Sequence, residues 1–192
     1  DIHCCPYVEE AYTSKKYAFV TDYVRLYAMY MCGGVYMDTD VEVVRSLDKF
    51  LSRRAFSGFE STHYVPTGIM ASEKGLPVIK ELLEYYTGRH FLKADGSQDT
   101  TTNCVSITNI MLSHGLKLDG KLQTVEDFTF YPADFFCPFE NETGILRKTD
   151  NTAAIHWFNK SWLPKGMRFR CKITRACRRL FGKNCLDWLK RK

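Results

Sequence analysis

The hydrophobic positions near the start of the chain follow the spacing of two amphipathic helices. Between residues 7 and 31, apolar side chains recur three or four positions apart, which predicts helical structure. Thr13 and Ser14 interrupt this pattern, so we expect them to separate the two helices. Gly33 and Gly34 follow the second helix and are typical of a helix end that requires a left-handed residue.

Short β-prone runs alternate with helical segments along the rest of the chain. We expect strands at residues 35–37, 41–44, 56–59, 68–71, 122–125, 129–131 and 153–157. We expect helices at residues 77–86 and 105–114, and a loop in the polar stretch 93–103. Pro77 suits the first turn of its helix. This alternation predicts an α/β domain in which helices are layered on a sheet.

The composition indicates one globular domain followed by a tail of different character. The 192 residues are 45% apolar and 26% charged, which is ordinary for a chain with a sizeable core. The formal net charge of +5 is unevenly spread, because residues 163–192 contain 11 basic residues and a single acid, Asp187. That segment carries +10, so the preceding residues carry about −5. We therefore divide the chain into a body, residues 1–162, and a basic tail, residues 163–192.

The tail has the pattern of an amphipathic helix. Apolar residues between positions 173 and 181 follow helical spacing, and lysines and arginines lie at the other positions around the helix. Such a helix is typical of segments that lie on anionic lipid headgroups, so an anionic membrane surface is an expected partner of residues 165–192. A solvated terminus is the alternative. We do not expect nucleic-acid binding, because no recognised reading module accompanies the charge.

The eight cysteines lack the spacing of a zinc site, because none forms a C-x-x-C pair. Nothing near Asp1 resembles a signal peptide, and no apolar run is long enough for a transmembrane helix. We therefore expect reduced and mostly buried thiols in a cytoplasmic protein. The tail would bring this protein to the inner face of the membrane.

Two acids, Asp38 and Asp40, are the candidate centre of a functional site. In an extended backbone, residues two positions apart point to the same side, so both carboxylates would face one divalent cation. Their hard oxygen atoms suit Mg²⁺ or Mn²⁺, which bridge nucleotide diphosphates. The same acid-x-acid pattern recurs at residues 40–42 and 140–142, so the pair alone is weak. The Val- and Tyr-rich run before it predicts a buried strand, where two carboxylates are costly without a cation.

Asp22 and Arg25 are the next candidates, because their spacing places them on one face of the second helix. A surface ion pair is the simpler interpretation. In the functional alternative, Asp22 accepts hydrogen bonds from sugar hydroxyls and Arg25 binds a sugar or phosphate oxygen. Ala18 on the same face leaves room for a ligand.

The run AFVTDYVRLYAMYMCGGVYMDTDVEV resembles the DXD sugar-binding segment of the family-32 glycosyltransferases, which include bacterial capsule and surface-polysaccharide transferases. The resemblance extends over GFE at residues 58–60, TGIMAS at 67–72, YPADFFCP at 131–138 and IHWFNKSW at 155–162. It covers about residues 7–162. The matching positions of the first run are Ala18, Asp22, Arg25, Gly33, Gly34, Tyr36, Asp38 and Asp40.

This resemblance implies a nucleotide-diphospho-sugar transferase fold of the GT-A type, with a mixed central sheet flanked by helices. It implies that Asp22 and Arg25 contact the donor sugar and that Asp38 contacts the sugar or ribose. It further implies that Asp40 binds the metal, with Asp38 beside it. Asp38 and Asp40 are therefore the catalytic candidates, and Mn²⁺ or Mg²⁺ is the expected cofactor.

The later motifs imply further site residues. His156 resembles a late histidine that completes the metal site in this fold, although a lone histidine after an apolar strand is also common in cores. Ser161 and Trp162 resemble a mobile loop that closes over the diphosphate and sugar, with a hydrophobic anchor as the alternative for Trp162. Gly68 is expected where the chain passes close to the donor or acceptor, and a bulge or turn glycine is the alternative.

The expected function is metal-assisted, retaining transfer of a sugar from a nucleotide-diphosphate sugar, with a UDP-sugar as the first choice. The acceptor would be a glycan or a lipid-linked molecule in polysaccharide or glycolipid biosynthesis. The family usually begins with a strand of the form I-P-K-x-I-H-x-x-W that helps to hold the base. No such segment precedes Asp1, so we expect an incomplete base pocket.

Two other functions remain open from the sequence. One is a non-catalytic carbohydrate- or membrane-binding domain derived from such an enzyme. The other is a phosphate-transferring enzyme, although the sequence contains no Gly-rich phosphate loop.

Overall fold

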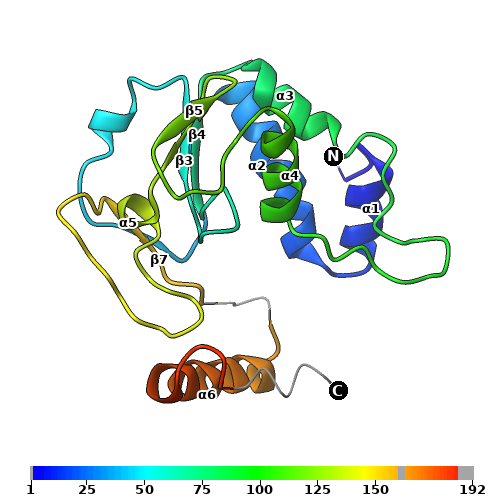
Figure 1. Ribbon diagram of the computed structural model, residues 1–192. Coiled ribbons are helices and arrows are strands. Elements are labelled where there is room, and N and C mark those ends of the chain that lie inside the picture. The colour runs from blue at the N-terminus through cyan, green and yellow to red at the C-terminus, as the bar shows by residue number, and fades with distance from the viewer. Residues whose placement is uncertain (1, 160–162, 186–192) are drawn as a thin grey trace.

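The computed structural model describes residues 2–159 and 163–185 and shows helices packed on a β-sheet (Figure 1). The helices are α1 (Pro6–Thr13), α2 (Tyr17–Cys32), α3 (Pro77–Glu84), α4 (Asn103–Ser113), α5 (Ala133–Phe136), α6 (Lys165–Phe181) and the 3₁₀ helix η1 (Asp48–Phe50). The strands are β1 (Gly34–Met37), β2 (Val41–Val43), β3 (Ala55–Gly58), β4 (Ile69–Ser72), β5 (Gln123–Val125), β6 (Phe128–Tyr131) and β7 (Ala154–His156).

Five strands form the main sheet in the order β1-β4-β3-β6-β5. β3 and β6 run parallel, whereas the other neighbours run antiparallel, so the sheet is mixed. β2 and β7 form a separate antiparallel pair in which Val41 lies opposite His156. The predicted α/β class with a mixed sheet and flanking helices is confirmed, and this architecture is compatible with a GT-A-like fold.

Alternate residues of the central strands serve two hydrophobic cores, one on each face of the main sheet. In β3, Ala55 packs in the core shared with α1, α2, α3 and α4, whereas Phe56 packs in a core with η1 and α5. In β4, Met70 belongs to the first core and Ile69 to the second. This alternation is expected where both faces of a sheet are covered. Figure 1 shows α2, α3 and α4 on one side of the sheet and α5 on the other.

A glycine makes the junction between α2 and β1 possible. Gly33 has a φ of +70° and donates its N–H to the carbonyl oxygen of Met29, which ends the helix as predicted. A Cβ at Gly33 would lie 2.7 Å from the backbone nitrogen of Lys74. Both the left-handed conformation and this close approach therefore require glycine. The chain enters β1 at the next residue and runs toward Asp38.

β1 differs most from its prediction. We predicted a buried strand at residues 35–37, but β1 forms an edge of the main sheet, and Val35 and Met37 are 37% and 41% exposed. A short apolar run does not reveal how many strands flank it. The helices η1 and α5 were not predicted, because three or four residues are too few to show a helical period.

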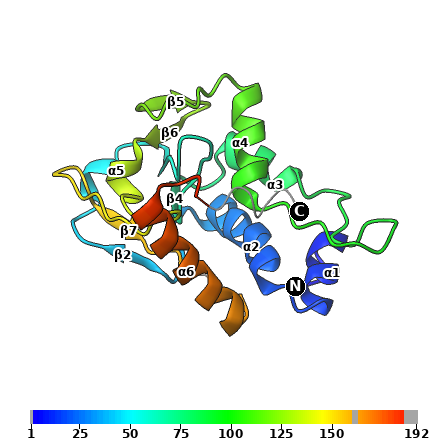
Figure 2. The same ribbon diagram turned by 60° about the horizontal axis from the view of Figure 1, so that its bottom comes forward.

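α6 confirms the predicted helix in the basic tail and contacts the body along one side. Arg175 donates hydrogen bonds to the carbonyl oxygens of Asn141 at 2.9 Å and Phe158 at 3.1 Å, and Lys183 forms an ion pair with Glu140. Figures 1 and 2 both place α6 next to the β7 end of the body. Within residues 2–159 and 163–185, no helix is long and apolar enough to cross a membrane.

The cysteines are less buried than predicted. All eight are free, but only Cys137 is buried, whereas Cys4 and Cys32 are exposed and the remaining five are half-buried. The prediction relied on the usual burial of this residue type. Cys4 instead precedes α1 and Cys32 ends α2, and both positions lie at the surface.

Replacing Phe136 with alanine should lower the free energy of unfolding by about 3–5 kcal/mol, because a large cavity would remain in the second core. The ring is fully buried and packs against Phe50 and Phe56. Leu51→Ala is the matched control, since Leu51 is 57% exposed and its loss should cost within about 0.5 kcal/mol. Chemical denaturation followed by circular dichroism measures both variants. Equal effects would contradict the assignment of this core.

Candidate active site

Asp38 and Asp40 lie in a turn that connects the two sheets. Asp38 follows β1 directly, and its carbonyl oxygen accepts a hydrogen bond from the N–H of Val41, the first residue of β2, at 3.0 Å. The N–H of Asp38 donates to the carbonyl oxygen of Gly68 at 2.8 Å, which holds the turn beside β4. The predicted extended backbone is therefore wrong. The two acids come together because the chain turns between them, not because a strand alternates.

β7 brings His156 to the same turn. The N–H of the next residue, Trp157, donates to the carbonyl oxygen of Asp40 at 3.0 Å. Nε2 of His156 lies 3.4 Å from a carboxylate oxygen of Asp40 and 3.9 Å from one of Asp38. One potential ligand atom from each of the three residues lies within 4.8 Å of the others. The three residues predicted as metal ligands thus form one cluster, which we call the acidic cluster.

The acidic cluster has the donor atoms for a divalent cation. Carboxylates favour Mg²⁺ or Mn²⁺, and an imidazole is a common further ligand. Nδ1 of His156 is buried and has no hydrogen-bond partner among the described residues, unlike that of a hydrogen-bonded core histidine. The ring stacks on Phe158 with 3.9 Å between centroids. Hydrogen bonds from His156 and from the N–H of Asn159 lower the pKa of Asp40, so its carboxylate is ionised.

Gly68 allows the backbone to pass close to the acidic cluster. A Cβ at this position would lie 3.0 Å from Nδ1 of His156 and 3.1 Å from a carboxylate oxygen of Asp38. The φ of Gly68 is not in the left-handed region, so the close approach, rather than a turn conformation, requires glycine here.

Arg25 connects α2 to the turn that contains Asp38 and Asp40, which we call the acidic turn. Its two terminal nitrogens lie 3.2 Å from a carboxylate oxygen of Asp22 and 3.3 Å from one of Asp38. The guanidinium also lies over the ring of Tyr36, whose hydroxyl donates to Asp38 at 2.9 Å. The side chains of Asp22 and Arg25 are each only 11% exposed. The pair is therefore buried and faces the acidic cluster, which the surface ion-pair interpretation did not anticipate.

Asp22 and Arg25 respond differently to their burial. Burial raises the pKa of Asp22 to about 6, although Arg25 and the N–H of Asn103 favour its ionised form. Asn103 is the first residue of α4, where the helix leaves backbone N–H groups free to bind a carboxylate. Burial lowers the pKa of Arg25, but Asp38 and Asp22 raise it by more, so the guanidinium stays charged.

Two residues near the acidic cluster were not among those predicted. Glu60 follows β3, and burial raises the pKa of its carboxyl, which contacts the thiol of Cys104 at 3.7 Å. The N–H of Asn159 donates to the carboxylate of Asp40 at 2.7 Å. Both lie in the GFE and IHWFNKSW runs, which gave no indication of these contacts. Two predicted residues, Ser161 and Trp162, lie outside the described part of the chain.

Comparison with known families indicates the class of this site. Residues 3–57 match the family model described as "Glycosyltransferase sugar-binding region containing DXD motif". The chain therefore contains a glycosyltransferase-like DXD region. The match includes Asp22, Arg25, Asp38 and Asp40 and covers less than a third of the 192 residues. No curated protein and no solved structure matches the chain.

The DXD region supports glycosyl transfer in general. A glycosyltransferase uses a nucleotide-sugar donor and a glycan acceptor, and DXD-type members usually bind a divalent metal. The acidic cluster supplies such a ligand group at the DXD sequence itself, and β7 adds His156 from beyond the matched residues.

Replacing Arg25 with glutamine should lower the free energy of unfolding by about 3–5 kcal/mol, because two largely buried carboxylates would lose their cation. Arg54→Gln is the control. Arg54 pairs with Glu73 and Asp127 but its side chain is 51% exposed, so solvent screens the pair and its loss should cost much less than the loss of Arg25. Urea unfolding at neutral pH, without divalent cations, measures both. An effect of Arg25→Gln no larger than that of the control would show that the pair does not stabilise the fold.

Proposed function

We propose that this protein is a metal-assisted glycosyltransferase of the GT-A fold type, which transfers a sugar from a nucleotide-diphosphate sugar to an acceptor hydroxyl. The observation that carries this proposal is that the acidic cluster lies next to the buried Asp22–Arg25 pair. Metal-binding acids beside hydrogen-bonding groups fit a substrate that contains both a diphosphate and a sugar. The resemblance to family-32 glycosyltransferases supports a UDP-sugar donor and retention of the anomeric configuration.

Asp40, Asp38 and His156 would hold Mn²⁺ or Mg²⁺ in this enzyme. When bound, the ion supplies positive charge that neutralises the leaving diphosphate. The chain keeps the ligands in position beforehand: His156 and the N–H of Asn159 hold Asp40, and Arg25 and Tyr36 hold Asp38. Such preorganisation is the main contribution that a protein makes to an electrostatically assisted step.

Asp22 and Arg25 are the proposed contacts of the donor sugar. The guanidinium of Arg25 presents several N–H donors in a fixed plane, and Asp22, once ionised above about pH 6, accepts hydrogen bonds from hydroxyls. Their position on α2 beside Asp38 supports a sugar bound between the helix and the acidic turn. Closure of Ser161 and Trp162 over the donor is part of the same proposal and follows from the resemblance.

The proposed acceptor is a glycan or a lipid-linked molecule in polysaccharide or glycolipid biosynthesis, of the kind that builds capsules. We place the catalytic part in residues 1–162 and the protein at the cytoplasmic face of a membrane, with the tail as a peripheral anchor. α6 contains seven basic residues and no acid. Phe169, Ile173 and Leu180 are 64%, 49% and 75% exposed and follow helical spacing along one side. This combination is typical of an interfacial helix.

Mutation of the metal ligand tests the proposed activity. With Mn²⁺ and a panel of UDP-sugars, the protein should release UDP, and Asp40→Asn should reduce this turnover at least about 100-fold, because the leaving diphosphate would lose its neutralising charge. Glu42→Gln is the matched control, since Glu42 belongs to the same run of acids but binds the indole N–H of Trp157 instead. It should keep turnover within about threefold. Equal turnover by Asp40→Asn and the unmodified protein would refute the metal assignment, and binding of the donor without any turnover would favour a non-catalytic domain.

A vesicle-binding assay tests the proposed membrane anchor. Ile173→Asn combined with Leu180→Asn should weaken sedimentation with anionic vesicles at least about tenfold, because two apolar side chains would no longer enter the lipid. Raised salt should weaken binding by the unmodified protein as well. Leu51→Asn with Leu122→Asn makes the same change at exposed positions of the body and should have little effect. Equal losses in both pairs would contradict anchoring through α6.

A further inference from the structure

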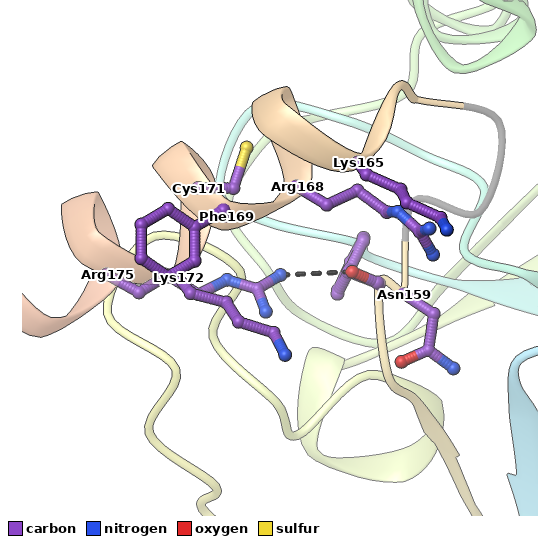
Figure 3. A pocket seen from close by; sticks show the side chains of 8 residues that line it. Asn159, Lys165, Arg168, Phe169, Cys171, Lys172 and Arg175 are labelled. Carbon is purple, nitrogen blue, oxygen red and sulfur yellow. Dashed lines mark hydrogen bonds between the residues drawn. The ribbon is translucent and has the colours of Figure 1, made fainter.

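A cavity of about 600 Å³ lies between α6 and the segment that follows β7. Figure 3 shows basic side chains that extend from α6 toward this segment, together with the hydrogen bond that Arg175 makes there. The residues that define its chemistry are Phe158, Asn159, Lys165, Arg168, Lys172 and Arg175. The main site described above does not use the four basic residues.

The lining of this cavity is strongly positive. It contains four basic side chains and no acid. Arg175 is engaged with Asn141 and the carbonyl oxygen of Phe158, which anchors the helix. Within residues 2–159 and 163–185, no carboxylate pairs with the side chains of Lys165, Arg168 or Lys172. Several cations that share a concave surface without a counter-charge attract an anion.

The cavity adjoins the acidic cluster through the two residues that they share. The ring of Phe158 stacks on His156, and the backbone N–H of Asn159 donates to a carboxylate oxygen of Asp40 at 2.7 Å. The carbonyl oxygen of Phe158 meanwhile accepts a hydrogen bond from Arg175 at 3.1 Å. A ligand in the cavity would therefore lie next to the proposed reaction centre, against the same segment that positions Asp40.

An exposed apolar stripe begins at the edge of the cavity. Phe169 lines the cavity and is 64% exposed, and it is followed on the same side of α6 by Ile173 and Leu180. The half-buried residues Cys171 and Arg178 lie on the opposite side of the helix, toward the body. The stripe thus points away from the body and leads directly into the cationic cavity.

We propose that the cavity binds a phosphate or diphosphate group carried by an amphiphilic molecule, whose apolar part lies along Phe169, Ile173 and Leu180. Arg168 is suited to bind two phosphate oxygens at once, and Lys165 and Lys172 add positive charge. A soluble phosphate would use the cations but not the stripe, and a neutral lipid would do the reverse. The role of this cavity as the acceptor site of the reaction rests on the proposed function. Its ability to bind a phosphate group rests only on the residues that line it.

Vesicles of defined composition test the proposal in the presence of EDTA and without any sugar nucleotide. One set contains phosphatidylcholine with phosphatidic acid, whose phosphate is a terminal monoester, and the other contains phosphatidylcholine with phosphatidylserine at equal surface charge. The unmodified protein should bind the phosphatidic acid vesicles at least about tenfold more tightly. Arg168→Gln with Lys172→Gln should remove this preference. Arg170→Gln with Arg179→Gln removes as much charge from exposed positions of α6 outside the cavity and should keep the preference.

Three results would overturn the proposal. The first is the absence of a preference for phosphatidic acid in the unmodified protein. The second is an equal loss of preference in both double variants, which would indicate diffuse attraction to charge. The third is calorimetric binding of inorganic pyrophosphate as tight as that of the vesicles and unchanged by Ile173→Asn with Leu180→Asn, which would identify a soluble phosphate as the ligand.

The outcome is distinguishable from failure of the proposed function. A preference for phosphatidic acid that depends on Arg168 and Lys172, in a protein without donor turnover, would refute the glycosyltransferase activity and leave the cavity as a phosphate-binding site. Donor turnover that requires Asp40, in a protein without this preference, would refute only the proposed phosphate-binding site in the cavity.

Discussion

Two carboxylates, Asp22 and Asp38, lie on the two sides of one arginine, and burial of their charges requires positive charge nearby. Arg25 balances Asp22 and Asp38, with one terminal nitrogen on each. On the other side of Asp38, the imidazole of His156 faces Asp40 at 3.4 Å. These contacts form only if α2, the acidic turn and β7 keep their positions relative to one another. The rest of the fold therefore has to hold these three elements in place.

The elements that hold these positions come from distant parts of the chain. Gly33 permits the sharp passage from α2 into β1, and Gly68 allows the neighbouring backbone to approach Asp38 and His156. Pairing of β2 with β7 places His156 opposite Val41. Each of these constraints is set by one glycine or one strand pair, and together they form a group of ligands suited to a divalent cation.

Much of this arrangement could be predicted from the sequence, because it depends on the spacing of residues that lie close together in the chain. The spacing of Asp22 and Arg25 put them on one helical face, and the motif at residues 155–162 singled out His156. The predictions failed where the outcome depends on tertiary contacts. The exposure of β1 depends on its neighbours in the sheet. Asp38 and Asp40 converge as predicted, but through a turn between two sheets and not along an extended strand. The sequence pattern made no prediction of which side of α6 faces the body, since this depends on the contacts of Arg175.

Asp38, Asp40 and His156 together have the donor atoms of a divalent cation site. Titration with Mn²⁺, followed by the electron paramagnetic resonance signal of the free ion, measures this directly. We expect one bound ion per chain, with affinity lowered at least about tenfold by His156→Ala and more strongly by Asp40→Asn. His63→Ala alters an exposed histidine outside the cluster and should leave the affinity unchanged. Mn²⁺ binding of equal affinity in all four proteins, or no binding to the unmodified protein, would show that these three residues do not form a cation site.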